Sequence, residues 1–263
     1  MRHSKYMPAA VLAMIIAAGY SFGPRVLAAP LSQANSQQDS KIQADIKASL
    51  SSNHFKDVQV TTKNGVVTLS GTVELYAYKE EAEKRATRNK NAKAIRNNIQ
   101  AGGPPIPDSD LQTKLVKKVE YDRVGYGTTA FNAISVTVHD GVVILSGHAY
   151  GPTDKDSAVS LVSYTPGVRE VVDEIEVDPV SPMDDRIRLQ TARSIYGHPA
   201  LNKYAIDPGK PIRISVQNGN VTLYGVVNSE MDKQIAYMQA NSVAGTFKVS
   251  NQIQVEGESS ERE

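Results

Sequence analysis

Hydrophobic and polar positions repeat three times along this 263-residue chain, in units of domain size. Each unit contains a phrase in which apolar and polar residues alternate between two glycines. The copies are Gly65–Gly71 (GVVTLSG), Gly141–Gly147 (GVVILSG) and Gly219–Gly225 (GNVTLYG), whose first glycines lie 76 and 78 residues apart. Solenoid repeats have periods of about 20–50 residues, so this longer period predicts three small domains instead.

An Asn-Gly or Asp-Gly pair opens each phrase and predicts a β-hairpin with a two-residue turn. These pairs supply the positive φ that both central residues of a type I′ turn require. The short turn also fixes the register, which predicts three central apolar pairs: Val60 with Leu69, Val136 with Leu145, and Ile214 with Leu223. The opposite face of each hairpin is largely polar, so we expect one buried face and one face in water.

The glycines of the repeat are expected to serve the fold rather than to cradle a phosphate. The first glycine of each phrase belongs to the turn. The second would lie on the core side of the hairpin, where a bulge or the close approach of a helix backbone explains it. With the glycines that precede the last strand of units two and three, the structural set is Gly65, Gly71, Gly141, Gly147, Gly167, Gly219, Gly225 and Gly245.

Apolar residues spaced by four predict a helix on either side of each hairpin. The stripes before the hairpins are Ile42, Ile46 and Leu50; Leu111, Leu115 and Val119; and Ile187, Thr191 and Ile195. The helices after the hairpins carry Ala82 and Ala86, Ala158 and Val162, and Ala236 and Ala240. With a final apolar strand, the pattern predicts an α+β fold of three tandem α-β-β-α-β domains, each a three-stranded mixed sheet with two helices on one face.

Proline-containing linkers separate the units and set their boundaries at 39–103, 109–178 and 184–256. Proline makes such linkers semi-rigid and limits how neighbouring units reorient. The Ser/Gln-rich segment 29–38 is expected to be flexible, and the acidic segment 257–263 is expected to be a disordered tail.

The first 28 residues have the composition of a secretory signal. Basic residues precede an apolar run over 7–19, and small residues at 26–28 provide a cleavage site. An uncleaved membrane anchor is the alternative. The chain has no cysteine, which excludes disulfides and a lipid-modified cysteine, so we expect a periplasmic protein that is not a lipoprotein.

Charge argues against nucleic acid as a partner. Without Arg2, Lys5 and Arg25 of the signal, 26 basic residues face 28 acidic ones, a net charge of −2. Duplex binding depends on neutralising phosphates, which this balance does not favour. The units nevertheless differ, with net charges of +4 over 39–103, −5 over 110–178 and +2 over 184–256.

The glycine-flanked hairpin, the Ala-x3-Ala helix and the Val-x3-Ile-x-Val strand together resemble the BON domain family, over roughly residues 39–256. This family includes osmotically inducible periplasmic proteins and outer-membrane lipoproteins of Gram-negative bacteria. The resemblance implies the same fold, a periplasmic location, no catalysis, and a proposed role in binding phospholipid or membrane surfaces. We also expect no cofactor. The chain departs from the family pattern at Asn91-Ala92, and in the longer loops of units two and three.

No catalytic or metal-binding constellation emerges from the sequence, so we expect a protein that is not an enzyme. The mature histidines are scattered, and the predicted register pairs His139 with Val142, several residue steps from His148. Neither the ligand spacing of a metal site nor a phosphate loop, dinucleotide fingerprint or nucleophile elbow is present.

A basic stretch over 79–96 is the first candidate binding site. One interpretation is a solvated helix surface with i, i+4 ion pairs such as Glu81 with Arg85. The other is contact with anionic lipid, worth about 1 kcal/mol per basic residue before screening. Its candidate residues are Lys84, Arg85, Arg88, Lys90, Lys93 and Arg96.

Aromatic residues in or next to the loops 121–133 and 197–211 are the second candidate: Tyr121, Tyr126, Phe131, Tyr196 and Tyr204. They would either cover a thin core or be exposed anchors for a partner. The sequence thus favours an exported binding protein that contacts anionic phospholipid, peripherally at most, during envelope or osmotic stress. The alternative is a chaperone-like adaptor that contacts an envelope protein.

Overall fold

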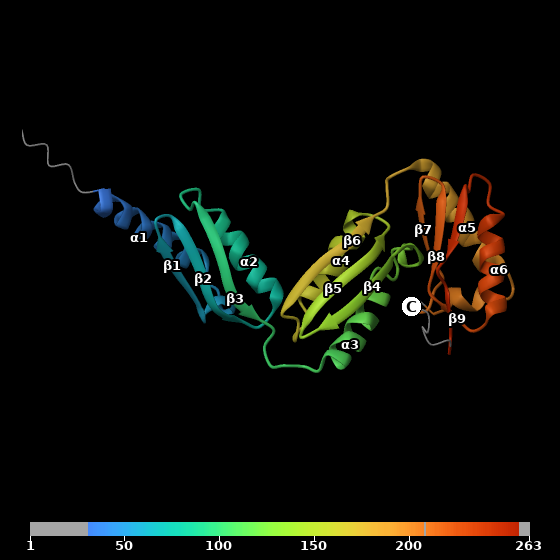
Figure 1. Cartoon of the computed structure of the whole chain (residues 1–263), viewed down its shortest axis with the longest axis horizontal. Helices are drawn as coiled ribbons and strands as arrows, with labels where there is room; N and C mark the ends of the chain where they lie inside the picture. The colour runs from blue at the N-terminus through green and yellow to red at the C-terminus, as the bar shows by residue number, and fades with distance from the viewer. Residues whose placement is uncertain (1–30, 208, 258–263) are drawn as a thin grey trace, which may run out of the picture.

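A computed structural model describes residues 31–207 and 209–257 of the chain. In that part, three domains follow one another along the long axis (Figure 1). Each has the order helix–strand–strand–helix–strand, and this confirms the predicted fold class. The predicted signal peptide (1–28) and nearly all of the predicted tail lie outside the described residues.

The three domains are built from equivalent elements, with an added 3₁₀ turn before each hairpin. Domain one contains α1 (Leu31–Ser49), η1 (Asn53–Phe55), β1 (Val58–Lys63), β2 (Val66–Val73), α2 (Tyr76–Thr87) and β3 (Ala94–Ala101). Domain two contains α3 (Asp108–Glu120), η2 (Thr129–Phe131), β4 (Ala133–His139), β5 (Val142–Ala149), α4 (Pro152–Ser163) and β6 (Glu170–Val177). Domain three contains α5 (Pro182–Gly197), η3 (Asn202–Ala205), β7 (Arg213–Gln217), β8 (Asn220–Tyr224), β9 (Val226–Val227), α6 (Glu230–Asn241), β10 (Lys248–Asn251) and β11 (Gln254–Val255).

The first helix begins earlier than the sequence predicted. We expected residues 29–38 to be flexible, but α1 is helical from Leu31. No glycine or proline interrupts α1, and its alanine and glutamine residues favour helix. The helix therefore extends beyond Asp39, where the repeat unit begins.

Each sheet has the predicted hairpin in antiparallel pairing and the last strand parallel to its second strand. The register is as predicted, with Val60 opposite Leu69, and the equivalent pairs in β4–β5 and β7–β8 also match. In domain three the parallel pairing is split at Gly225 into β8–β10 and β9–β11. The sequence pattern therefore determined both the pairing and the face that each residue occupies.

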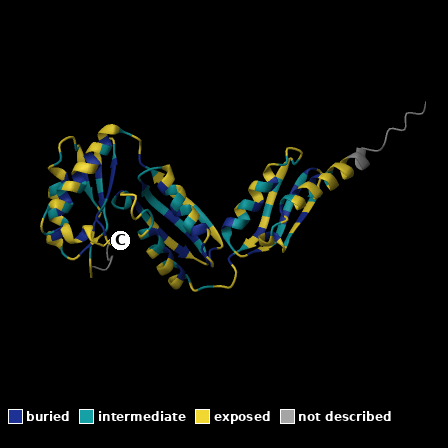
Figure 2. Cartoon of the chain, turned by 180° about the vertical axis from the view of Figure 1, so that it is seen from behind, coloured by how far each residue is buried: buried dark blue, intermediate teal, exposed yellow. Residues whose placement is uncertain are grey.

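The predicted helical stripes form the cores. All nine stripe residues before the hairpins, and all six small residues at the centres of α2, α4 and α6, are buried. Figure 2 shows these helices with buried residues toward the sheets and exposed residues outward. Alanine at Ala82 and Ala86 brings α2 close to its sheet but buries little apolar area. Ala236 and Ala240 occupy the same positions in α6, so domains one and three share this feature.

The second glycine of each phrase is required by the neighbouring strand, not by a helix or a bulge as we expected. Gly71 has φ 109°, and a Cβ atom there would lie 2.0 Å from the carbonyl oxygen of Asp57. Gly147 has φ 99° and a similar contact at 2.1 Å with the carbonyl of Ala133. The backbone that leads into the first hairpin strand thus excludes any side chain at this position.

The polar face of the third hairpin is not in water, in contrast to our expectation. Ser215 is only 3% exposed, and Arg213 and Gln217 on the same face are half-buried. Domain two covers this face: the guanidinium of Arg213 donates to the carbonyls of Thr129 (3.0 Å) and Asn132 (2.7 Å). The alternation of polar and apolar residues within one unit does not show that a neighbouring domain will cover its polar face.

Candidate functional site

The six basic candidates do not form one surface. Lys84 and Arg85 lie on the last turns of α2 and Arg88 caps it, whereas Lys90 and Lys93 follow the helix. Arg96 lies on β3, opposite Thr68 of the polar sheet face, away from the helices. The expected single contact site is therefore divided among a groove, one end of the domain and the open sheet face.

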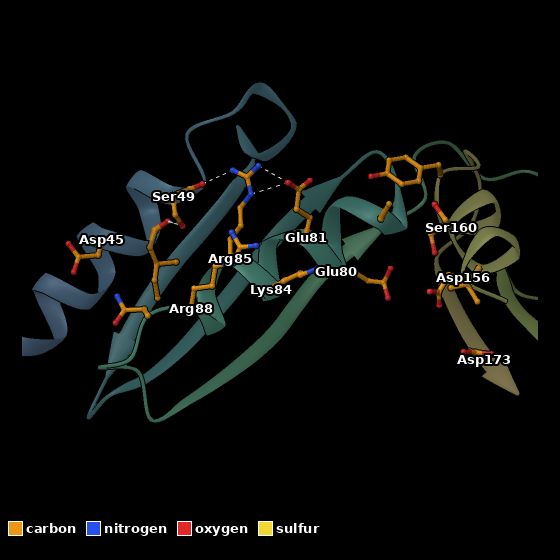
Figure 3. Close-up of a pocket in the computed structure, with 16 residues that line it drawn as sticks. Asp45, Ser49, Glu80, Glu81, Lys84, Arg85, Arg88, Asp156, Ser160 and Asp173 are labelled. Carbon is orange, nitrogen blue, oxygen red and sulfur yellow. Dashed lines mark hydrogen bonds and ion pairs between the residues drawn. The ribbon is translucent and has the colours of Figure 1, made fainter. Parts of the chain in front are cut away.

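The groove lies between domains one and two and has a volume of about 990 Å³. Figure 3 shows Lys84, Arg85 and Arg88 on the domain-one side, with Asp156 and Asp173 on the side of domain two. Five acidic residues also line it: Asp45, Glu80, Glu81, Asp156 and Asp173. The pKa of Glu80 is raised, and the main cause is the burial of its carboxyl group. Carboxylates outnumber cations here, so the groove does not suit an anionic ligand by charge alone.

Arg85 has a structural role in this groove. Its guanidinium donates to Glu81 Oε1 at 2.6 and 3.0 Å and to the carbonyl of Ser49 at 2.7 Å, and it lies 5.1 Å from the Phe55 ring. The interpretation of an i, i+4 ion pair is thus confirmed for Glu81 and Arg85. Lys84 and Arg88 are exposed and make no ion pair within the described residues.

Lysines gather at the end of domain one that carries the Asn-Gly turn. Lys63 ends β1 next to the turn, Lys93 begins the approach to β3, and Lys90 lies between α2 and β3. The Lys93 N–H donates to the Gly65 carbonyl at 2.8 Å, and its side chain lies over Gly65. All three side chains are exposed, and none makes an ion pair among the described residues. We call Lys63, Lys90 and Lys93 the cationic end.

An aspartate fixes the turn in every domain, a feature that the sequence analysis missed. The Asp39 carboxylate accepts the N–H groups of Asn64 and Gly65, both at 2.7 Å. Asp108 accepts from the second turn at 2.6 and 2.9 Å, and Asp184 accepts from the third at 3.0 and 2.7 Å. We call this contact the aspartate clamp. The signal was present, because each aspartate lies three residues before the first residue of the apolar stripe.

The residue that covers the turn glycine differs between the domains. It is Lys93 in domain one, Arg169 in domain two and Phe247 in domain three, and each donates its N–H to that glycine's carbonyl. The Arg169 side chain also lies against Gly102 of the first linker. All three side chains are exposed, but in the middle copy this position also contacts the linker at a domain junction.

The aromatic loop residues divide into two groups. Phe131 and Tyr204 are buried, and the half-buried Tyr196 donates its hydroxyl to the Ile212 carbonyl at 2.6 Å. Burial raises the pKa of Tyr196 above the ordinary range. Tyr121 and Tyr126 are 46% and 70% exposed. The structure thus favours the core-covering interpretation for three of the five, and Phe131 covers the core of domain three rather than its own.

Each long loop is hydrogen-bonded to a buried carboxylate in the first turn of the second helix of its domain. Asp154 accepts from Arg123 (3.2 Å), Thr128 (2.7 Å) and Asn132 (3.0 Å). Asp232 accepts from Lys203 and Tyr204, each at 2.8 Å. Its own N–H donates to Ser229 Oγ, so Ser229 caps α6, but Asp232 is turned to the loop instead of completing a capping box.

The described residues contain no cluster of three or more His, Cys, Asp or Glu side chains able to hold a metal ion. Among the helices of this described part, none is long and apolar enough to cross a membrane. His139 pairs with Val142, as predicted, and His148 lies at the other end of β5. The histidines therefore do not converge on a common site.

The family model of the BON domain matches residues 38–103, 107–179 and 199–257, most of the chain. The chain belongs to the BON domain family. The third match begins after α5, yet α5 occupies in this BON domain the place that α1 and α3 have in the others. The family fold is therefore present in three complete copies within the described residues.

Osmotically-inducible protein Y of Escherichia coli (strain K12) is similar to this BON protein, with 28% identity over 156 residues. That match covers 54% of the chain and 74% of the relative. Among solved structures, CdsD, a structural protein of the type III secretion system of Chlamydia trachomatis, shares 16% identity, with 82% and 92% of the two chains covered and a TM-score of 0.24. The periplasmic domain of PrgH from S. typhimurium shares 11% identity, with 80% and 98% covered and a TM-score of 0.20. At such scores the two structures carry no argument about this chain.

Proposed function

We propose that this chain is an exported, non-catalytic periplasmic protein that docks reversibly on anionic phospholipid surfaces and acts under osmotic stress. Membership of the BON family and the similarity to an osmotically inducible protein support this proposal. Its attachment would be peripheral, through charged side chains of the described domains.

The observation that carries the proposal is the cationic end of domain one. Lys63, Lys90 and Lys93 are exposed without ion pairs in the described part of the chain. The carboxylate of Asp39 on α1, which contacts the turn, already accepts two N–H groups. The three ammonium groups are therefore free to face lipid phosphates.

The number of lysines in the cationic end gives the expected strength of docking on an anionic lipid surface. At about 1 kcal/mol per lysine near an anionic surface, three lysines supply about 3 kcal/mol. This is weaker than a millimolar dissociation constant, which corresponds to about 4.1 kcal/mol. Docking should therefore weaken sharply with salt, because exposed charges are screened beyond about 8 Å at physiological ionic strength.

Co-sedimentation of the mature chain with vesicles tests the proposal. We expect binding to phosphatidylglycerol or cardiolipin vesicles at low salt, little binding to phosphatidylcholine, and progressive loss as salt rises. The triple variant K63Q/K90Q/K93Q should lose most of the low-salt binding.

A matched variant removes the same number of charges elsewhere. Lys47, Lys56 and Lys114 are exposed and unpaired within the described residues, so K47Q/K56Q/K114Q should bind nearly as the wild type does. Equal loss in both variants would mean that only net charge matters and would remove the assignment to the cationic end. Absence of wild-type binding to either anionic lipid at low salt would reject the function itself.

The rival role as an adaptor has less support. It relied on aromatic loop anchors, and Phe131 and Tyr204 are inside the protein. Tyr121 is also occupied, since its hydroxyl donates to Asp207 Oδ1 of the next domain at 3.1 Å. The loops thus serve mainly contacts within the chain.

A further inference from the structure

Domain three exposes large apolar side chains around its turn. Val180 of the linker is 90% exposed, Met183 at the start of α5 is 53% exposed, and Phe247 is 82% exposed. We call these three residues the apolar tip. Exposed apolar side chains that gather in one place, with polar residues around them, are typical of interaction sites.

The backbone around the apolar tip is fixed. Asp184, next to Met183, holds both N–H groups of the turn, and Phe247 donates its N–H to the Gly219 carbonyl at 2.9 Å. The Phe247 ring lies so close to Gly219 that a Cβ atom there would be 2.4 Å from the ring. Val180 is held from both sides, because Asp178 is bonded to β7 and Ser181 caps α5. The three side chains are therefore presented on a rigid frame.

The fold does not require an aromatic residue at this place. Lys93 and Arg169 occupy the equivalent position in the other domains and make the same backbone hydrogen bond. Phe247 thus changes the side chain that domain three exposes at this position, but not the fold of the domain.

The charges around the apolar tip favour an anionic surface. Arg186, one helical turn after Met183, and Lys248, next to Phe247, are exposed and make no ion pair among the described residues. The nearby acids are engaged: Asp184 accepts two backbone N–H groups, and Asp185 pairs with Arg188. Free cations beside exposed apolar groups match the headgroup and acyl boundary of an anionic bilayer.

We propose that the apolar tip is a membrane-insertion element, in which Phe247, Met183 and Val180 enter the interface of an anionic bilayer while Arg186 and Lys248 remain among its phosphates. This inference rests on the proposed function and extends it to a second contact of different chemistry. Phenylalanine is among the residues that interfacial elements place at the boundary between headgroups and acyl chains. The cationic end and the apolar tip, on one chain, would reinforce each other's binding.

The decisive variant is F247K, which gives domain three the residue found in domain one. It adds a positive charge, so a purely electrostatic contact would bind more tightly, whereas an inserting contact would bind more weakly. We expect the salt-resistant part of vesicle binding to fall about 10-fold, the effect of withdrawing one large apolar side chain. The control is I206K, at a loop residue that is 80% exposed in the same domain, which should not lower binding. Circular dichroism checks that both variants fold.

A second measurement locates the residue directly. Because the chain has no cysteine, Phe247→Cys provides a single thiol for an environment-sensitive fluorophore, and Ile206→Cys provides the matched control. We expect a blue shift on phosphatidylglycerol vesicles at position 247 and none at 206.

Three outcomes would overturn the inference in distinguishable ways. If wild-type protein sediments with anionic vesicles but the label at 247 stays in water, the proposed function stands and the apolar tip has no part in it. If the label shifts with protein concentration in the absence of lipid, the tip pairs with a second copy of the chain instead. If wild-type protein binds no anionic lipid, both proposals fail together.

Discussion

At the residue scale, the aspartate clamp is what holds each hairpin turn in place. The turn residues Asn64, Asp140 and Asn218 have φ of 53°, 50° and 52°, a left-handed conformation that Asn and Asp adopt more readily than other side-chain-bearing residues. Two hydrogen bonds to a carboxylate, each worth about 1.5–3 kcal/mol, stabilise this conformation further. The clamp also connects the first helix to the hairpin.

Replacing a clamp aspartate should therefore destabilise its own domain. We expect Asp184→Ala to lower the free energy of unfolding of domain three by about 2–3 kcal/mol, since its carboxylate is buried and both turn N–H groups lose their acceptor. Hydrogen exchange of the β7 and β8 amides measures this for one domain of a multidomain chain.

The exposed Asp156 serves as the control, because no hydrogen bond or ion pair of its side chain is seen in the described residues. Asp156→Ala should change stability by less than about 0.5 kcal/mol. Exchange rates in β7 and β8 that are unchanged by Asp184→Ala would show that the clamp contributes nothing to stability.

At this scale the sequence predicted the turn but not its clamp. Asn-Gly and Asp-Gly give the turn type directly, because φ is a local property of the residue. The Asp39 contact spans 25 and 26 residues, and nothing local to Asp39 shows that its carboxylate reaches the turn. Alignment of the three copies on their apolar stripes would have revealed the shared aspartate.

At the element scale, the long loops of domains two and three are closed by Asp154 and Asp232. Domain one has Tyr78 at the equivalent position, stacked on His54 with ring centres 4.1 Å apart. Its short η1 connection has no long loop to close. The two domains with a long loop therefore have an aspartate at this position, and the domain with a short loop has a tyrosine.

Acid should release the loop of domain three. Burial alone would raise the pKa of Asp232, but hydrogen bonds from Lys203 and Tyr204 outweigh it and lower the pKa below its usual 3.8. A lowered pKa in the folded state means that the carboxylate stabilises the fold above the unfolded pKa, and that this contribution disappears as pH falls through the folded value. The stability difference between wild type and Asp232→Asn should thus be full at pH 7 and should shrink below about pH 4.

Urea unfolding of both proteins between pH 3 and pH 7 provides the measurement. Asp156→Asn is again a suitable control, because no hydrogen bond or ion pair of the Asp156 side chain is seen in the described residues. A constant difference for Asp232→Asn down to pH 3 would contradict the loop-closing role of the charge.

The burial of side chains was predicted well where the periodicity within one domain determines it. It was predicted poorly where a neighbouring domain determines it. The stripe Ile187, Thr191 and Ile195 is buried as expected, because spacing by four places residues on one helix face. Phe131 was expected to cover its own domain or to be exposed, and instead it enters the core of domain three. The position of the Phe131 side chain depends on how domains two and three pack together, and the repeat pattern carries no information about that packing.

At the scale of the whole molecule, domains two and three are joined by a buried ionic network. Asp178 at the end of β6 accepts from Arg188 of α5 at 3.2 Å and from Ser215 of β7 at 2.9 Å. Both charged side chains are almost fully buried, at 0% and 1% exposure, and Arg188 lies 4.9 Å from the Tyr150 ring. Domains one and two instead meet through the Gly102–Gly167 backbone hydrogen bond and the edge contact of Tyr78 with Tyr164.

The network should keep domains two and three in a fixed orientation. We expect Asp178→Ala to separate them, because removal of one partner from a buried ion pair leaves an uncompensated charge and is unfavourable by about 3–5 kcal/mol. Spin labels on cysteines introduced into the outer faces of α4 and α6 should show a longer and broader distance distribution. Labels on α2 and α4 should be unaffected.

Two comparison variants complete this test. Asp178→Ala combined with Arg188→Met removes both charges and should recover part of the original distance distribution. Lys155→Met breaks the ion pair with Asp173 inside domain two and should leave the distribution unchanged. An unaltered α4–α6 distance in Asp178→Ala would show that apolar contacts such as that of Phe131 suffice.

The variation at the position shared by Lys93, Arg169 and Phe247 gives each copy a different neighbour or a different exposed side chain. A chain rearranged in the order one–three–two would press Phe247 against the linker glycine that now receives Arg169. A fragment that starts at domain two would leave Arg169 without Gly102 beside it. The three copies therefore share a backbone but not a surface, and removal of one domain would remove a surface that the other two do not reproduce.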